Sequence, residues 1–237
     1  MKIGGLKKLS LSDFPNTPSC VVYLSGCNLR CPFCYVREFV LPEESQKHSI
    51  ISEKDFFKFL KEKRDWLQGV CVSGGEPTIY PELVGFFRKI KKSGYKTKLD
   101  TNGSNPDLVA SLIARGLIDY LAVDIKAPRE KYSQTVGFGE AAVNYLLSKI
   151  DKTIQLAKSS SVDYEFRTTA VPGLIEKRDI LEIAKWLKPA RKYVINRFVS
   201  DGNLLDESLK TRRPLSDKDL FKIKQAISPF FDIVKVA

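Results

Sequence analysis

The sequence predicts an α/β fold in the form of a partial (βα)6 TIM-like barrel. Short β-rich runs alternate with amphipathic helical stretches, a pattern typical of βα units around a parallel sheet. Successive strands lie roughly thirty residues apart, the usual length of a βαβ repeat. Because six units are too few to close an eight-stranded barrel, we expect the sheet to stay open.

The strands are expected where β-branched and aromatic residues concentrate between turn residues. Those of the barrel span residues 19–24, 69–72, 95–99, 120–125, 163–170 and 193–198. The helices are expected from about residue 52, then at 81–92, 106–116, 140–158 and 177–187, with a final helix at 217–227 and a final strand at 232–236. Ser52 is a good N-cap, Pro106 opens the third helix, and Gly94 and Gly116 end the second and third.

Length and composition favour a single domain over residues 1–237, with a core barrel at about 18–200 and the C-terminal helix and strand at about 214–237. Hydrophobic content of 43% and charged content of 28% are ordinary for a globular protein with a full core. No apolar run reaches the roughly twenty residues of a membrane span, and the N-terminus lacks the apolar core of a signal peptide. We therefore expect a cytoplasmic protein that does not associate with membranes.

The net charge of +11 comes from 39 Lys and Arg against 28 Asp and Glu. Such an excess could serve nucleic acid, an acidic protein partner or an anionic cofactor. The basic residues are spread over helical runs such as 58–64 and 89–92, which is typical of solvated helix faces. No nucleic-acid-binding signature is present, so binding to nucleic acid is not expected.

Three cysteines, Cys27, Cys31 and Cys34, lie in one short segment after the first barrel strand. A [4Fe–4S] cubane needs a ligand at each iron, so three thiolates can hold three corners and leave the fourth iron open. A structural zinc site closes its tetrahedron with a second Cys or His pair. Three unrelated thiols and an incomplete zinc knuckle remain as alternatives.

The other candidate zinc ligands are isolated. Cys20 and Cys71 lie in β-rich runs and are expected in the core. His48 is the only histidine, in a polar segment, and no ligand role is expected for it.

Further polar motifs follow the next strands. Gly74 and Gly75 allow a close approach of the backbone to a ligand, and Glu76 adds an acceptor, although the segment could be a plain turn. Asp100 and Asn102 end the third strand, where Asn-Gly also favours a turn.

Charged residues follow at the fourth to sixth strands. Asp124 and Lys126 share one strand face and could form a site or only an ion pair. Arg167 could point into the barrel or lie on the surface, and the sixth strand ends with Asn196 and Arg197, the weakest candidates.

The spacing C-x3-C-x2-C, with an aromatic residue before the last cysteine, resembles the signature of the radical S-adenosylmethionine (radical SAM) enzymes. The whole chain looks like their glycyl-radical-enzyme activases, and it is most similar to anaerobic ribonucleoside-triphosphate reductase activating proteins. The matching segments are 10–15, the cysteine loop, 73–77, 100–103, 124–126 and 170–173. Tyr35 departs from the pattern, because many activases have His followed by Asn there.

This resemblance implies a barrel of the radical SAM type, a [4Fe–4S] cluster and S-adenosylmethionine. Cys27, Cys31 and Cys34 would bind the cluster. The residues that would bind S-adenosylmethionine are Tyr35, Gly74, Gly75, Glu76, Asp100, Asn102, Asp124, Lys126 and Arg167. Asn196 and Arg197 would lie on the substrate side.

The resemblance also implies partners. The enzyme would form a glycyl radical on a partner, expected to be anaerobic ribonucleoside-triphosphate reductase, with electrons from a flavodoxin- or ferredoxin-type donor. One alternative is a radical SAM enzyme that acts on a small molecule or nucleotide, such as a deazapurine synthase. A noncatalytic Fe–S or zinc-binding adaptor is the other.

Overall fold

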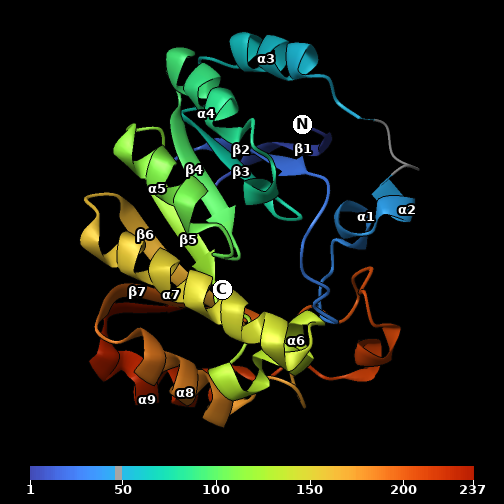
Figure 1. Ribbon diagram of the computed structural model, residues 1–237, viewed down its shortest axis with the longest axis vertical. Coiled ribbons are helices and arrows are strands. Elements are labelled where there is room, and N and C mark those ends of the chain that lie inside the picture. The colour runs from blue at the N-terminus through green and yellow to red at the C-terminus, as the bar shows by residue number, and fades with distance from the viewer. Residues whose placement is uncertain (46–49) are drawn as a thin grey trace.

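The computed structural model describes residues 1–45 and 50–237, so His48 lies outside the described residues. Eight strands form one sheet in the order β1 to β8 (Figure 1). β1 is antiparallel to β2, and every pairing from β2 to β8 is parallel. The predicted open barrel of parallel strands is therefore confirmed. The strands are β1 (Ile3–Ser10), β2 (Ser19–Leu24), β3 (Gly69–Gly74), β4 (Lys96–Thr101), β5 (Tyr120–Asp124), β6 (Asp163–Ala170), β7 (Ala190–Arg197) and β8 (Phe231–Val236).

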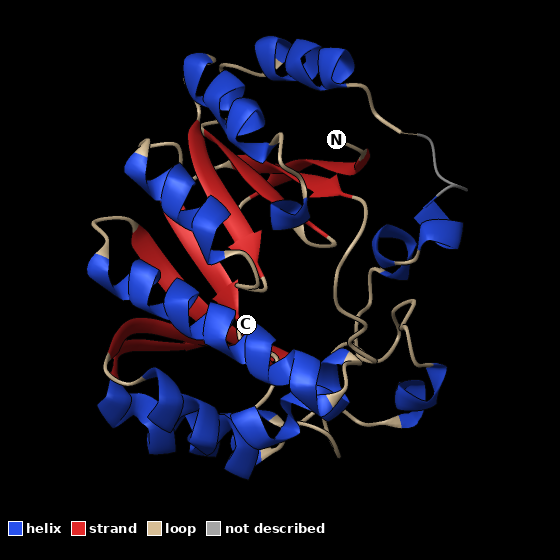
Figure 2. Cartoon of the chain, in the orientation of Figure 1, coloured by secondary structure: helices blue, strands red, loops and turns tan. Residues whose placement is uncertain are grey.

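The longer helices follow one another along one face of this sheet (Figures 1 and 2). The helices are α1 (Arg37–Val40), α2 (Pro42–Ser45), α3 (Glu53–Glu62), α4 (Leu83–Lys92), α5 (Pro106–Ala114), α6 (Tyr132–Val136), α7 (Glu140–Ser159), α8 (Lys177–Leu187) and α9 (Asp217–Ile227). The predicted caps are present. Ser52 accepts a hydrogen bond from the Asp55 N–H, and Gly94 and Gly116 have φ values of +83° and +62°.

The sheet begins earlier than expected, because β1 precedes the predicted start of the barrel near residue 18. β1 was not predicted because two glycines and two lysines interrupt the usual strand pattern in its sequence. The glycines are required by packing: a Cβ on Gly5 would lie 2.8 Å from Cζ of Phe39. The short helices α1, α2 and α6 were not predicted either, and β4 extends through Asp100 and Thr101.

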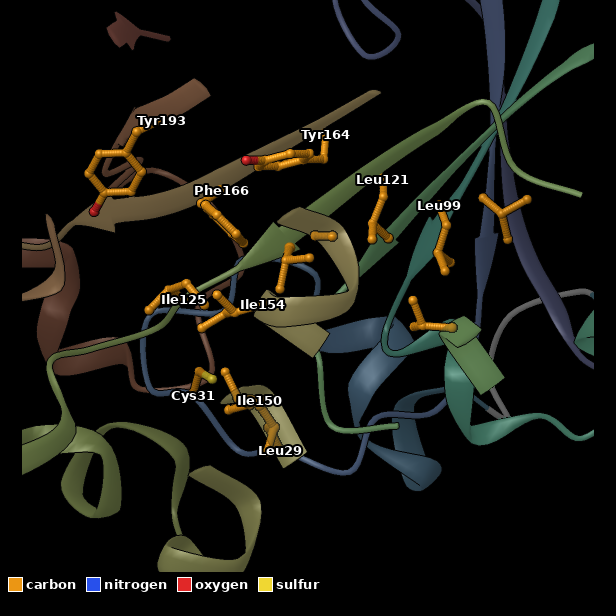
Figure 3. Close-up of a cluster of buried hydrophobic side chains, with 14 of the residues drawn as sticks. Leu29, Cys31, Leu99, Leu121, Ile125, Ile150, Ile154, Tyr164, Phe166 and Tyr193 are labelled. Atoms are coloured by element: carbon orange, nitrogen blue, oxygen red, sulfur yellow. The ribbon is translucent and has the colours of Figure 1, made fainter. Parts of the chain in front are cut away.

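Alternate residues of the strands face opposite sides of the sheet. Leu99, Leu121 and Phe166 belong to the hydrophobic core, together with Ile154 of α7 (Figure 3). Between these residues on the strands, polar side chains face the concave side, which the longer helices leave uncovered. Among the described residues, no helix has the length and apolar character to span a membrane.

Candidate active site

The concave side of the sheet encloses a cavity of about 1050 Å³. Every predicted site residue lies on its wall, and six successive strands or the loops that follow them contribute. These residues are Cys27, Cys31, Cys34, Tyr35, Gly74, Gly75, Glu76, Asp100, Asn102, Asp124, Lys126, Arg167, Asn196 and Arg197. They meet because the C-terminal ends of parallel strands gather at one edge of the sheet. The structure thus brings the candidates together, while the role of each remains a prediction.

All five cysteines are free thiols, and the three of the cysteine loop line the cavity. Cys31 is buried in the same cluster as Leu29 and Ile150, whereas Cys27 and Cys34 are half-buried (Figure 3). Burial raises the pKa of Cys27 to about 11 and that of Cys31 to about 12. The metal-free thiols are therefore protonated at neutral pH and would release protons when they bind iron.

Backbone hydrogen bonds from two distant segments hold the cysteine loop. The Arg30 N–H donates to the carbonyl of Val136 in α6 at 3.0 Å. The Leu205 N–H donates to the carbonyl of Cys34, and the Asp206 N–H donates to that of Pro32, both at 2.9 Å. Both α6 and the segment after β7 therefore fix the loop, through different residues of it.

The Gly74-Gly75-Glu76 segment lies directly against the end of β2. Gly74 has a φ of +123°, and a Cβ there would lie 2.3 Å from the backbone of Leu24. A Cβ on Gly75 would lie 2.0 Å from the carbonyl oxygen of Gly26. The Gly75 and Glu76 N–H groups donate to the carbonyls of Leu24 and Gly26, both at 2.8 Å. Both glycines are therefore required by the backbone contact with the start of the cysteine loop.

The carboxylate of Glu76 is 1% exposed and accepts four hydrogen bonds from the protein. Thr78 donates its N–H at 3.0 Å and its hydroxyl at 2.6 Å. Thr101 donates its hydroxyl at 2.7 Å, and Asn102 donates its N–H at 2.6 Å. Burial raises the pKa of Glu76, and these hydrogen bonds oppose the shift. Most of its acceptor capacity is used within the protein, so this predicted ligand acceptor mainly joins two loops.

A closed ring of hydrogen bonds among Asn28, Asn102 and Ser104 joins the cysteine loop to the loop after β4. Nδ2 of Asn102 donates to Oδ1 of Asn28 at 2.9 Å, and Nδ2 of Asn28 donates to the hydroxyl of Ser104 at 2.9 Å. The Ser104 N–H returns to Oδ1 of Asn102 at 3.0 Å. Sequence reasoning missed Asn28, although its place between two cysteines was a signal.

Five charged side chains form an alternating row across β4, β5 and β6. Lys98 contacts Asp100 at 2.5 Å, and Arg167 bridges Asp100 at 3.2 Å and Asp124 at 2.7 Å. Lys126 completes the row at 3.0 Å from Asp124. Burial alone would raise the pKa of Asp124, but the charges of Arg167 and Lys126 outweigh it and hold the pKa well below its usual value. Lys98, 1% exposed, was missed although it shares a strand face with Asp100.

A second charged group lines the same cavity. Lys192 contacts Glu165 at 2.6 Å, and the Tyr120 hydroxyl donates to Glu165 at 2.9 Å. Lys192 also contacts the Tyr120 hydroxyl at 3.1 Å. Six cations line the cavity within the described residues, and five of them have a carboxylate partner. The paired cations are Lys126, Arg167, Arg191, Lys192 and Arg197. The sixth, Lys235, has none.

The thiols fit a cubane better than a single metal ion. Within residues 1–45 and 50–237, no three Cys, His, Asp or Glu side chains converge as the ligands of one ion would. In a cubane each thiolate binds a different iron, so the sulfur atoms need not converge on one point. Three free thiols on one loop beside an open cavity match the ligand set expected for a cluster with one open iron.

Comparison with known proteins identifies the superfamily. The profile of the radical SAM superfamily matches residues 21–187, more than half of the chain. The chain belongs to the radical SAM superfamily. The predicted barrel type is thereby confirmed, and membership implies a [4Fe–4S] cluster and S-adenosylmethionine.

Two relatives illustrate the range of radical SAM proteins that this chain resembles. A Methanocaldococcus jannaschii protein, provisionally named a glycyl-radical enzyme activating enzyme, is 32% identical over 237 residues, which cover 99% of this chain and 95% of the relative. A 7-carboxy-7-deazaguanine synthase from Methanopyrus kandleri is 29% identical over 135 residues, which cover 48% of this chain and 52% of that protein.

Solved radical SAM structures share the fold. Streptococcus suis SuiB, bound to its precursor peptide SuiA, superposes with a TM-score of 0.66 at 14% identity. The superposition covers 92% of this chain and 48% of SuiB. At this identity the likeness shows the fold alone.

Proposed function

We propose that the protein is a glycyl-radical-enzyme activating enzyme whose partner is an anaerobic ribonucleoside-triphosphate reductase. The similarity to the M. jannaschii relative over nearly the whole of both chains carries this proposal. In the proposed reaction one electron breaks the S–C5′ bond of S-adenosylmethionine, which gives methionine and a 5′-deoxyadenosyl radical. That radical removes a hydrogen atom from a glycine Cα of the partner, leaving 5′-deoxyadenosine and a glycyl radical.

In this proposal, one set of residues would bind the cluster and another would orient S-adenosylmethionine. Cys27, Cys31 and Cys34 would bind three irons of the cluster, which supplies the electron when bound. The backbone at Gly74 and Gly75 would accept hydrogen bonds from the ammonium group of S-adenosylmethionine. Residues proposed to contact the rest of the cofactor are Tyr35, Asp100, Asn102, Asp124, Lys126 and Arg167, with Glu76 positioning their loops.

The charge balance of the cavity supports a peptide substrate over a nucleotide. A phosphate- or carboxylate-bearing substrate is best held by cations that are free to pair with it. Among the described residues, five of the six cations that line the cavity are already paired with carboxylates, and only Lys235 is not. A neutral peptide backbone needs no such surplus. Asn196 and Arg197 are proposed as its polar contacts.

The partial similarity to a deazaguanine synthase supports a second candidate function, that of a radical SAM enzyme that acts on a small molecule. A noncatalytic adaptor, by contrast, would bind metal without cleaving S-adenosylmethionine. We place the protein in the cytoplasm, where a reducing environment keeps the thiols free and a flavodoxin- or ferredoxin-type protein donates the electron.

Deuterium transfer tests the proposal. The reconstituted protein is reduced with dithionite and given the intact reductase whose radical-forming glycine carries deuterium at Cα. Label in 5′-deoxyadenosine and a glycyl radical signal in electron paramagnetic resonance are expected. Label that arrives only from an added nucleotide or pterin would replace the activase with the small-molecule enzyme. No 5′-deoxyadenosine with any substrate would favour the adaptor.

A further inference from the structure

Four exposed apolar side chains surround the open side of the cavity. Leu11 is 74% exposed, Tyr35 60%, Val199 45% and Ile233 49%, and all four line the cavity. They come from the loop after β1, the cysteine loop, the segment after β7, and β8. Apolar side chains gathered at one opening mark an interaction surface, which we call the apolar rim.

β8 presents an unpaired backbone edge beside this rim, because within residues 1–45 and 50–237 its one neighbouring strand is β7. The Ala237 N–H donates to the Ile195 carbonyl at 3.0 Å, and the Arg197 N–H donates to the Ala237 carbonyl at 2.9 Å. Backbone groups of alternate residues point to opposite sides of a strand. The N–H and C=O groups of Val234 and Val236 therefore face the free edge.

The side chains of β8 alternate in the same way. Ile233 and Lys235 line the cavity, whereas Val234 is buried in the core. Lys235 has no ion-pair partner within the described part of the chain, unlike the other five cations that line the cavity. On its cavity side, β8 therefore offers one apolar side chain, Ile233, and one cationic side chain, Lys235, next to the free backbone edge.

The other edge of the sheet is less available. Ile3 of β1 forms a bridge with Ile51, and the Ile51 N–H donates to the Ile3 carbonyl at 2.9 Å. The Phe39 ring lies against the next residues of β1, Gly4 and Gly5. The start of β1 is therefore occupied, whereas among the described residues no bridge forms on the outer edge of β8.

We propose that the glycine-bearing loop of the partner enzyme binds in extended form as an additional strand on β8. This inference rests on the proposed function. Backbone hydrogen bonds to Val234 and Val236 would hold the loop, and its apolar side chains would lie on the apolar rim. Cross-strand pairing favours an acidic residue of the loop beside Lys235. A strand edge binds its partner through backbone hydrogen bonds. This mode of binding suits a substrate whose reacting residue is glycine, because glycine has no side chain to be recognised.

Backbone methylation of the loop tests the pairing. The probe is a fluorescein-labelled synthetic peptide that spans the radical-forming glycine of the ribonucleotide reductase from the same genome. Its affinity for the reconstituted holoprotein with S-adenosylmethionine is measured by fluorescence anisotropy. N-methylation at alternate residues should weaken binding about two- to tenfold each, and methylation between them should have little effect. Equal effects at consecutive positions would overturn strand pairing.

Variants of β8 test the same edge from the protein side. Val236→Pro removes one edge donor at a position where an edge strand tolerates proline, so binding should weaken about two- to tenfold relative to Val236→Ala. Ile233→Glu should weaken binding at least about tenfold through loss of apolar contact. Phe221→Glu, at a similarly exposed residue of α9 that does not line the cavity, should bind like the wild type. Melting temperature and cluster absorbance show that each variant is folded.

The outcomes separate this inference from the proposed function. A wild-type protein that forms the glycyl radical, with Val236→Pro and Ile233→Glu binding as tightly as their controls, would overturn docking on β8 and leave the activase intact. A dimer in solution that Val236→Pro dissociates would assign the edge to a second copy of this chain instead. If N-methylation weakens peptide binding at alternate residues but no radical forms on the reductase, the docking mode would stand and the activase function would be rejected.

Discussion

Asn28 and Asn102 are joined by a hydrogen bond of 2.9 Å between their side-chain amides. Asn28 lies between two of the cysteines, and Asn102 donates its own N–H to Glu76. One pair of residues thus links the cysteine loop to the loops after β3 and β4. We expect the position of the cluster relative to S-adenosylmethionine to depend on this link.

Asn28→Ala should keep the cluster but weaken binding of S-adenosylmethionine about two- to tenfold, because the two loops lose one direct hydrogen bond. Affinity is measured by titrating the reconstituted protein and following the spectrum of the reduced cluster. Asn144→Ala, at an exposed position on α7, is the matched control. Wild-type affinity in Asn28→Ala would show that the remaining contacts fix the loops.

Replacing Cys27, Cys31 or Cys34 with Ala should abolish stable cluster binding, since two thiolates cannot hold a cubane firmly. Iron and sulfide content and visible absorbance after anaerobic reconstitution are the measurements. Cys20→Ala and Cys71→Ala should keep about four irons, because both thiols are buried in strands of the sheet. A folded Cys71→Ala protein without a cluster would show that the ligands are wrongly assigned.

Asp100→Ala and Lys126→Ala should retain the cluster absorbance and weaken binding of S-adenosylmethionine roughly tenfold to a hundredfold, because each loses a charge-assisted contact. Glu76→Ala should weaken binding too, and it should also lower the melting temperature, because four buried donors lose their acceptor. Isothermal titration and thermal unfolding separate the two effects. Unchanged affinity in all three variants would reduce these segments to structural turns.

Acid should remove a contribution of Asp124 to stability. Its pKa in the folded protein lies below the ordinary carboxyl value of about 3.9, so its contribution is complete above that value and is lost as the pH falls through the folded pKa. Urea unfolding of the metal-free protein is followed by circular dichroism between about pH 5 and about pH 3. The wild type should lose more unfolding free energy over this range than Asp124→Asn. Parallel losses would show that the ion pairs of Asp124 add nothing to stability.

The order of the parallel strands could be predicted because runs such as 120–124 are rich in strand formers and are followed by turn or helix signals. The placement of the candidate residues at one edge followed from that order. β1 could not be predicted, since Gly4 and Gly5 carry no strand signal and are explained by the Ser25 and Phe39 side chains that lie against them.

Hydrogen-bond partners between loops were also beyond sequence reasoning. Glu76 was predicted as an acceptor for a ligand, but its partners Thr101 and Asn102 follow it by about 25 residues and reach it only through the parallel pairing of β3 with β4. Lys98 was overlooked because a lysine in a strand usually faces water. Its position became clear only from the ion pair with Asp100.

The backbone bonds from Leu205 and Asp206 to the cysteine loop have a consequence for biosynthesis. The ribosome makes Cys27, Cys31 and Cys34 well before the residues that hold their loop from one side, because Leu205 and Asp206 follow Cys34 by about 170 residues. A nascent chain that ends before β7 therefore presents three thiols on a loop without its final shape. Delivery of iron and sulfide would thus be productive only after the segment that follows β7 has been made.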